Sequence, residues 1–486
     1  MNTEFFKMME AAAFTNPFSD ARVEIDRQIV GASEGASWDE MQEPLFQALE
    51  KNIQALGNVK ELVAVEREGR PQGSPVRASV LFYVFYQMQE KFDELIEEQI
   101  AVGDEPCRAP FAFQCLEQLR GYGFSRAEAC RYVGIFYQIR RAFYFISKGL
   151  IGDSVCMKQL RARLWDNIFT HEISWYVQCL WNRMEDFSTL LLGETGTGKG
   201  AAAAAMGRSG FIPFNPTTQM FEESFTRAFI SINLSQYPEA LIESELFGHR
   251  KGAFTGAVEK HDGLFARCSP HGAIFLDEIG DVSVPTQIKL LQVLQERTFS
   301  PVGSHERLRF EGRVIAATNK SIDTLRHEEK FRDDFYYRLC SDIITVPPLR
   351  LRIRETPREL EDLVNHLTQR ICGSTLKIPM VGTLKECVGK NYAWPGNVRE
   401  LEQAIRRILL TGSYSGDTAV EPRQELGLGQ ATGTGSLTAK RLVQKYCHDL
   451  YETYGNYGEV ARRIGLDWRT VKKHVEKGCE LPVKSA

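Results

Sequence analysis

Residues 189–206 read TLLLGETGTGKGAAAAAM. The first four residues predict a short buried strand, and the alanine-rich run that ends at Met206 predicts a helix. Between them, the pattern Gly193-x4-Gly198-Lys199 has the spacing of a phosphate-binding loop, in which glycines let backbone N–H groups close around phosphates at a helix N-terminus. The order of strand, loop and helix therefore predicts a nucleotide site. Its predicted ligands are Gly193, Glu194, Thr195, Gly196, Thr197, Gly198, Lys199 and Gly200.

Further short apolar runs alternate with helical segments, which is typical of an α/β domain with a parallel sheet. One of these runs ends in two carboxylates, Asp277 and Glu278, and another is followed by Thr318 and Asn319. The strands are predicted at Ser188–Leu192, Phe229–Asn233, Ala273–Asp277 and Arg313–Ala317.

A glycine-rich hexapeptide lies between the two halves of the predicted nucleotide site. Two glycines and small side chains surround one phenylalanine, so neither a stable helix nor a core strand is expected. The pattern predicts a flexible loop with an aromatic tip. The hexapeptide is Gly252-Ala253-Phe254-Thr255-Gly256-Ala257.

These motifs together resemble the AAA+ central domain of bacterial enhancer-binding proteins, the activators of sigma-54 RNA polymerase. The resemblance covers residues 185–410 well and the C-terminal residues moderately, but it does not extend to the first 180. It implies that the hexapeptide contacts the sigma factor. It also implies an AAA+ P-loop NTPase core over residues 181–348 and a helical lid over residues 349–412.

The resemblance assigns roles within the nucleotide site, with ATP and Mg²⁺ as cofactors. Asp277 is implied as the magnesium carboxylate and Glu278 as the base that orients or deprotonates the attacking water. Asn233 is implied to pair with that glutamate in the idle site. Asn319 matches a sensor of the γ-phosphate.

Two further motifs extend the resemblance to arginines. The run 331–339 reads FRDDFYYRL, and it places Arg332 and Arg338 as the fingers that enter a neighbouring subunit's site. The run 394–401 reads WPGNVREL and aims Arg399 at the nucleotide. A site completed by a neighbour implies self-association, with a hexameric ring expected.

The sequence departs from the family at Gly200. A phosphate loop generally carries Ser or Thr there as a magnesium ligand, and this family usually carries Glu. Glycine offers no ligand, so magnesium must rely on Asp277, phosphate and water.

Residues 1–180 are predicted to be mostly helical and regulatory, and they contain no motif that identifies a signal. The aromatic-rich stretch 111–151 allows two interpretations, a packed helical core or a ligand pocket lined by aromatic side chains. A phosphoreceiver domain is not expected, because alternating strands and helices with an early acidic pair are missing.

The C-terminal end is predicted to bind double-stranded DNA. Residues 413–437 are rich in Gly, Ser and Thr and predict a linker, and residues 438–486 are basic. The run 456–474 predicts two helices broken at Gly465, and it resembles a Fis-type helix-turn-helix. The predicted DNA contacts are Arg469, Thr470, Lys472, Lys473 and His474.

Composition places the chain among ordinary water-soluble proteins. Its 486 residues are 43% hydrophobic and 25% charged, with a net charge of −4, and no apolar run is long enough to span a membrane. Eleven scattered cysteines favour reduced thiols and a cytoplasmic location over disulfides or a zinc site.

Two functions follow as hypotheses. The first is an ATP-driven transcription activator that binds upstream DNA and remodels sigma-54 RNA polymerase. The second is a DNA-bound regulator that binds ATP as a signal with little hydrolysis, which only Gly200 favours.

Overall fold

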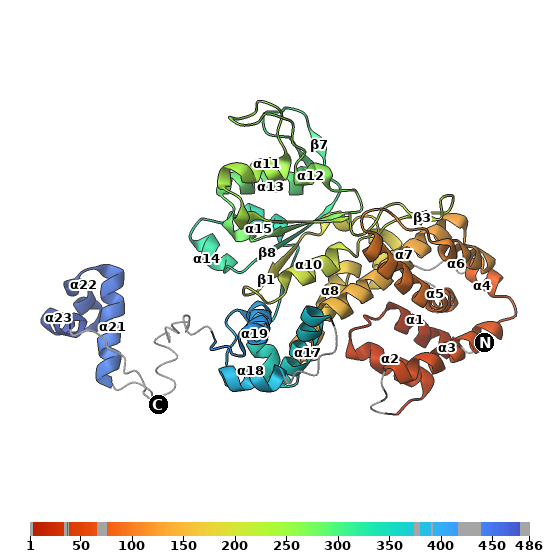
Figure 1. The fold of residues 1–486 in the computed structure, drawn as a ribbon, viewed down its shortest axis with the longest axis horizontal. Helices are drawn as coiled ribbons and strands as arrows, with labels where there is room; N and C mark the ends of the chain where they lie inside the picture. The colour runs from red at the N-terminus through yellow and green to blue at the C-terminus, as the bar shows by residue number, and fades with distance from the viewer. Residues whose placement is uncertain are drawn as a thin grey trace. The chain divides into compact units, whose positions relative to one another are not determined.

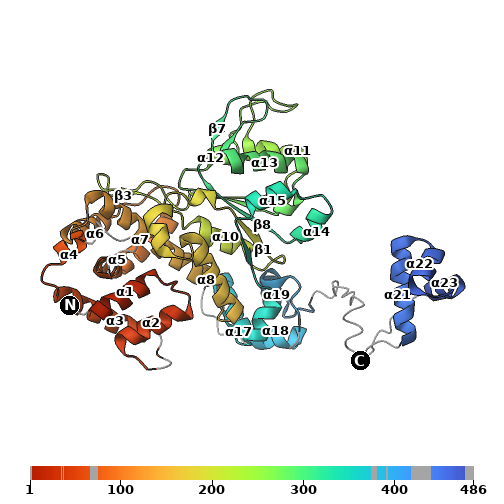
Figure 2. The same ribbon diagram turned by 180° about the vertical axis from the view of Figure 1, so that it is seen from behind.

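The computed structural model describes residues 3–33, 36, 38–65, 75–373, 380–389, 392–416 and 439–476. The chain divides into two compact units, Met1–Gly416 and Asp417–Ala486. Figures 1 and 2 show the ribbon from opposite sides.

A five-stranded parallel sheet forms the centre of the first unit (Figure 1). Its strand order is β4-β5-β8-β1-β9, and neighbouring strands run parallel. The four predicted strands are present. β9 was not predicted, because four residues shortly before Pro347 carry little pattern of their own. The strands are β1 Thr189–Leu192, β4 Phe229–Asn233, β5 Ala273–Asp277, β8 Arg313–Thr318 and β9 Asp342–Thr345.

Helices cover both faces of the sheet. Because successive strand residues point to opposite faces, neighbouring residues of one strand pack into different cores. Leu190 packs in a core with α13 (Val284–Glu296), whereas its neighbour Leu191 packs in a core with α10 (Lys199–Gly207). The α/β class and the parallel sheet with flanking helices are therefore confirmed.

The residues before the sheet are mostly helical, as predicted. The aromatic-rich helix α7 begins at a capping box, in which the Ser125 hydroxyl accepts from the Glu128 N–H and the Glu128 carboxylate accepts from the Ser125 N–H. Two short turns of π- and 3₁₀-helix, Tyr176–Leu180 and Met184–Asp186, lead into β1. The helices are α1 Thr3–Phe14, α2 Asp20–Val30, α3 Trp38–Gln54, α4 Val59–Val65, α5 Pro75–Val102, α6 Pro110–Gly121, α7 Arg126–Gly149, α8 Val155–Phe169 and α9 Ile173–Trp175.

The packing has no break at residue 180, where the domain boundary was predicted. Phe214 and Phe221, from the hairpin β2 (Phe214–Asn215) and β3 (Met220–Phe221) that follows α10, lie in the core of the N-terminal helices. In the other direction, Leu164 and Trp165 of α8 lie in the core that covers the sheet. The aromatic stretch 111–151 contributes to both cores, which favours the packed-core interpretation for most of it.

Short elements connect the strands beyond β4. The hexapeptide 252–257 lies in the connection between the helices α11 and α12. The elements are η3 Leu234–Gln236, α11 Glu239–Phe247, α12 Leu264–Arg267, η4 Ile279–Asp281, β6 Thr298–Phe299, β7 Leu308–Arg309, α14 Ile322–His327 and α15 Asp333–Leu339.

The predicted helical lid follows Pro348 and has its own core. Leu363, Trp394 and Leu401 are buried together there. Figure 1 shows these helices beneath the carboxyl end of β1. They are α16 Leu349–Glu355, α17 Glu359–Cys372, α18 Met380–Val388 and α19 Asn397–Thr411.

The second unit contains α21 (Ala439–Tyr454), α22 (Tyr457–Ile464) and α23 (Trp468–Glu476), which pack around Val460 and Val471. Gly465 ends α22 in the left-handed conformation, at the position where the sequence predicted a break. Most of the predicted linker 413–437 and the last ten residues lie outside the described residues.

Candidate functional site

The predicted phosphate loop is formed between β1 and α10. Gly196 and Gly198 have φ angles of 80° and 105°, a left-handed conformation that favours glycine. A Cβ atom at Gly196 would lie 2.2 Å from the carbonyl oxygen of Gly396, so the loop also approaches the lid too closely for a side chain. The loop therefore needs these glycines for both backbone shape and packing.

Lys199 begins α10 and turns back into the loop. Its Nζ donates to the carbonyl oxygens of Gly193, at 2.8 Å, and Glu194, at 3.2 Å. Burial lowers the pKa of this ammonium, while the carboxylates of Glu278 and Asp277 counteract that shift. A buried cation at the centre of such a loop is suited to phosphate binding.

Asp277 ends β5 beside the end of β4. The two strands pair in parallel with Asn233 opposite Asp277, and the Asn233 amide donates to the Asp277 carboxylate at 3.3 Å. In this structure the asparagine therefore bonds to Asp277 rather than to Glu278, the partner that the resemblance implied. Parallel register brings the two side chains together at the carboxyl edge of the sheet.

Glu278 is held in the left-handed region with φ 57°, which is uncommon for a residue with a side chain. Its carboxylate accepts from the backbone N–H of Asn319 at 3.4 Å. The Asn319 amide in turn donates to the Thr195 hydroxyl at 2.9 Å. The predicted sensor thus lies between the phosphate loop and the predicted catalytic carboxylate.

The lid is bonded directly to the phosphate loop. The N–H of Val398 donates to the Gly196 carbonyl at 3.0 Å, next to Arg399, which lines the nucleotide pocket. The fully buried Asn397 donates to both the Glu194 carboxylate and the Thr195 carbonyl at 3.1 Å. These bonds place the predicted sensor arginine over the loop.

The nucleotide pocket has a volume of about 500 Å³ and contains residues that the sequence analysis did not predict. The end of α7 and the start of its connection to α8, residues 148–151, form one wall, and α17 forms another through Leu363 and His366. The apolar members of these walls suit a nucleobase. No motif upstream of residue 180 had indicated that these residues pack against the nucleotide site.

A buried ion pair ties these two walls together. Arg352 and Glu359 are 3% and 0% exposed, and their Nε and Oε1 atoms lie 2.7 Å apart. The second oxygen of Glu359 accepts from the backbone N–H groups of Asp153 and Ser154 at 2.9 Å. Because a buried carboxylate needs such partners, the α7–α8 connection is fixed to the lid.

The residues at the site fit a magnesium ion held mainly by phosphate and water. Asp277, at the end of β5, is among the residues that line the pocket, and Gly200 contributes no side chain. Within the described residues, no group of three or more metal-ligating side chains gathers anywhere. Magnesium in nucleotide sites is commonly bound by one or two carboxylates plus phosphate oxygens, so this donor set is sufficient.

Arg332 and Arg338 lie outside the residues that line this pocket. Arg332 is exposed and pairs with Asp334 at 2.7 Å. Arg338 is half-buried and donates to the Leu294 carbonyl at 2.9 Å. The structure therefore does not bring the two predicted fingers to the pocket of their own chain.

The hexapeptide forms a turn closed by a bond from the Gly252 N–H to the Ala257 carbonyl at 2.8 Å. Thr255 is exposed and Phe254 is 38% exposed at the tip. An antiparallel bridge between His249 and His261 forms the stem. The loop is thus presented on a braced base with an apolar ring available for contact.

Among the predicted DNA contacts, Arg469, Lys472 and Lys473 are exposed on α23. Thr470 and His474 are half-buried on the same helix. Exposed cations on one helix do not by themselves identify a DNA partner, so DNA binding stays a prediction. Within the described residues, no helix is long and apolar enough to cross a bilayer.

Comparison with known proteins gives two family matches. Residues 176–345 match the sigma-54 interaction domain, and residues 354–421 match the AAA+ ATPase lid domain. The transcriptional regulatory protein ZraR of Klebsiella oxytoca is 35% identical over 332 residues, which cover 66% of this chain and 67% of ZraR. The DNA-binding transcriptional regulator NtrC of Azospirillum brasilense is 39% identical, over 46% of this chain and 43% of that protein.

The chain spans less than half the length of NtrC. A crystal structure of NtrX from Brucella abortus has a TM-score of 0.40 at 20% identity, covering 75% of this chain and 79% of that one.

Proposed function

We infer, from the premise that this chain belongs to the family of sigma-54-dependent transcriptional regulators, that it couples ATP hydrolysis to the activation of sigma-54 RNA polymerase. The observation that carries this proposal is a nucleotide pocket and an exposed hexapeptide loop within one family-matched domain. The pocket combines Lys199, Asp277 and Glu278.

Each group in the pocket has a task in phosphoryl transfer. Lys199 neutralises charge on the β- and γ-phosphates, and Glu278 orients the attacking water and accepts its proton. Bound magnesium, with Asp277 as its protein carboxylate, supplies charge neutralisation at the phosphates. Asn319 couples γ-phosphate binding to the position of Glu278, because its side chain bonds to Thr195 of the loop and its backbone N–H bonds to the Glu278 carboxylate.

Hydrolysis requires a second copy of the chain. A transferring phosphoryl group needs cationic stabilisation, and the pocket's own chain places Arg332 and Arg338 elsewhere. A neighbouring subunit in a ring, expected to be a hexamer, would supply them.

A short path leads from the nucleotide to the hexapeptide. The Asn233 side chain bonds to Asp277 and also accepts from the N–H and hydroxyl of Ser235 in η3. α11 follows η3 directly and ends at Phe247, five residues before Gly252. A change at Asp277 during hydrolysis would therefore move α11 and the loop that contacts the sigma factor.

The C-terminal unit is proposed to hold the protein at upstream DNA. The support is the run of exposed cations on α23, which can contact phosphates or base edges in the major groove. A cytoplasmic location fits this role.

The second candidate function is a DNA-bound regulator that uses ATP as a signal with little turnover. Gly200 favours it, because the position that usually provides a polar side chain beside the metal provides none.

The experiment for the main proposal is Thr255→Ala, because the Thr255 hydroxyl forms no hydrogen bond among the described residues. We expect ATP turnover and DNA binding near wild type, with transcription from a sigma-54 promoter reduced by at least ~tenfold. Thr217→Ala, at another exposed threonine, is the matched control. Normal transcription by Thr255→Ala would reject the loop as the sigma contact.

A further inference from the structure

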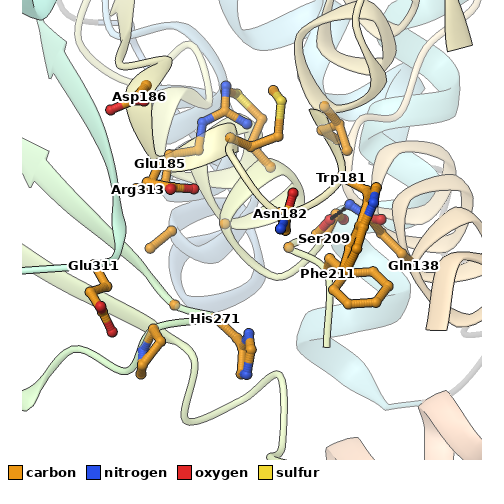
Figure 3. A pocket seen from close by; sticks show the side chains of 18 of the residues that line it. Gln138, Trp181, Asn182, Glu185, Asp186, Ser209, Phe211, His271, Glu311 and Arg313 are labelled. Carbon is orange, nitrogen blue, oxygen red and sulfur yellow. Dashed lines mark hydrogen bonds between the residues drawn. The ribbon is translucent and has the colours of Figure 1, made fainter. Parts of the chain in front are cut away.

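A second cavity of about 590 Å³ lies at the amino ends of the strands, whereas the nucleotide pocket lies at their carboxyl ends. Figure 3 shows this second cavity from close by. Its lining includes the first residues of β5 and β8, Ala273 and Arg313, whereas Asp277 of the nucleotide site ends β5. Its volume falls in the range of small-molecule sites. The proposed ATP-driven reaction has no use for this cavity.

The cavity has an apolar side and a charged side. Figure 3 shows Trp181 and Phe211 together on one side and Glu185, Asp186 and Glu311 away from them on the other. The rings of Trp181 and Phe211 meet edge to face with centroids 4.7 Å apart. Such a wall offers a planar apolar group a large contact area.

Most charges around the cavity are neutralised in pairs. Arg297 pairs with Asp186 at 3.1 Å, and Arg309 pairs with Glu311 at 3.0 Å. The two remaining charged side chains of the lining are Glu185 and Arg313.

Arg313 donates to neutral oxygens, at 2.9 Å to the Phe187 carbonyl and at 2.6 Å to the Asn167 amide, rather than to a carboxylate. The Glu185 carboxylate forms no ion pair with any residue that the structure describes. A net-neutral molecule with one group of each sign would complement this pair of charges.

The same cavity borders the contact between the N-terminal helices and the phosphate-loop helix. Arg141 of α7, fully buried, donates at 2.7 Å to the carbonyls of both Arg208 and Gly210, just after α10 ends. Gln138 donates to the Ser209 carbonyl at 2.9 Å and accepts from the Tyr176 hydroxyl at 2.7 Å. We call these residues of α7 the α10 cap.

The cap is placed to act on the nucleotide site. Arg141 fixes the chain just after the C-terminus of α10, where the helix dipole also favours a cation. α10 has only nine residues, with Lys199 at its start. A movement of the α10 cap is therefore passed through the short helix α10 to the phosphate-binding lysine. The cap is also connected to the cavity, because Gln138, Tyr176 and Ser209 are among its lining residues.

We propose that this cavity is an effector site for a small zwitterion with a planar apolar group, and that its occupancy controls ATP binding through the α10 cap. The apolar group lies against Trp181 and Phe211, the cationic group faces Glu185, and the anionic group faces Arg313. Occupancy shifts the segment after α10, which Gln138 and Arg141 hold, and α10 carries this shift to Lys199.

The site is tested by calorimetric titration of the full chain with L-tryptophan as the probe. Tryptamine and indole-3-propionate, each lacking one charge, are the comparison ligands. We expect the zwitterion to bind at least ~tenfold more tightly than either. Trp181→Ala should weaken it by a similar factor, whereas Trp175→Ala, an exposed tryptophan outside the lining, should not.

Binding is measured without turnover, so this result is independent of the proposed function. No binding by any of the three probes, or equal binding by Trp181→Ala, overturns the site. Tryptamine or indole-3-propionate binding as tightly as tryptophan overturns the zwitterion assignment.

The coupling is tested with Arg141→Met and its neighbour Arg140→Met, which loses a pair with Asp93 and a contact with the Phe143 ring but no bond to the segment after α10. In wild type, tryptophan should lower the Kd for ADP, and ADP should lower the Kd for tryptophan by the same factor, as linkage requires. Arg140→Met should keep this coupling. Arg141→Met should bind tryptophan but lose the coupling, and a coupling that survives in Arg141→Met overturns the role of the cap.

Discussion

Glu194, inside the phosphate loop, forms a two-point ion pair with Arg350 at the start of the lid. The two N–O distances are 2.6 and 2.7 Å. The hydrogen bond from Arg350 is the main reason that the pKa of Glu194 lies below its ordinary value, and Asn397 adds to the effect. The loop that binds phosphate and the lid that covers it are therefore joined by charge as well as by backbone bonds.

Loss of this pair should weaken nucleotide binding more than catalysis. Arg350→Ala should raise the Kd for ATP by ~three- to tenfold with a smaller change in kcat, because partly exposed pairs contribute modestly. Glu194→Ala should have at least as large an effect, because it also loses the bond from Asn397, and the double variant should be no worse than Glu194→Ala. Arg354→Ala, an exposed arginine on the same helix, is the control; additive effects would argue against a direct pair.

The pair also predicts a pH dependence with a definite sign. The folded pKa of Glu194 is depressed below 4.5, so its contribution is present above pH 4.5 and is lost as the pH falls through the folded value. The difference in melting temperature between wild type and Arg350→Ala should therefore be constant at neutral pH and vanish in stronger acid. A difference that grows on acidification would contradict this.

A shared site predicts that two inactive variants restore each other. Arg338→Ala should bind ATP but not hydrolyse it, and wild-type activity should rise more than linearly with protein concentration. A mixture of Arg338→Ala with Glu278→Gln should exceed either variant alone, because an intact pocket then meets an intact finger. Arg307→Ala, at an exposed arginine, is the control; turnover by Arg338→Ala alone would reject the shared site.

Glu278→Gln alone should trap ATP and keep the ring engaged with the sigma factor. The amide has the same shape but accepts no proton, so hydrolysis stops while binding continues. Filter retention of ATP compared with wild type measures the trap. Because the backbone here is in the left-handed region, a fall in ATP affinity would indicate a structural role for this side chain instead.

Gly200→Glu tests the one departure from the family pattern. A Cβ at this position meets nothing within 4 Å, so the backbone site accepts a side chain without a clash at its first atom. We expect turnover to change by less than ~tenfold, or ~1.4 kcal/mol in barrier height. Gly200→Ala separates the carboxylate from the gain in helix propensity, and a far larger gain for Glu alone would support the slow-hydrolysis function.

Motifs with local spacing were predictable from sequence. The phosphate loop, Asp277 and Glu278 follow apolar runs, and a short run of residues carries both the strand signal and the chemistry. The hexapeptide likewise combines its turn chemistry and its exposed ring in six consecutive residues. Such features depend on neighbours along the chain, so the sequence by itself determined the fold class, the nucleotide site and the family.

Only the tertiary structure decided how these pieces are joined. Glu194 meets Arg350, Glu359 meets Ser154, and Arg141 caps α10, although each pair of partners is separated by many residues. The chain upstream of residue 180 contains no motif, yet it supplies one wall of the nucleotide pocket. The reason is physical: a buried charge is recognised by the carbonyls, N–H groups and opposite charges that packing brings to it, and sequence spacing does not encode which distant segments meet.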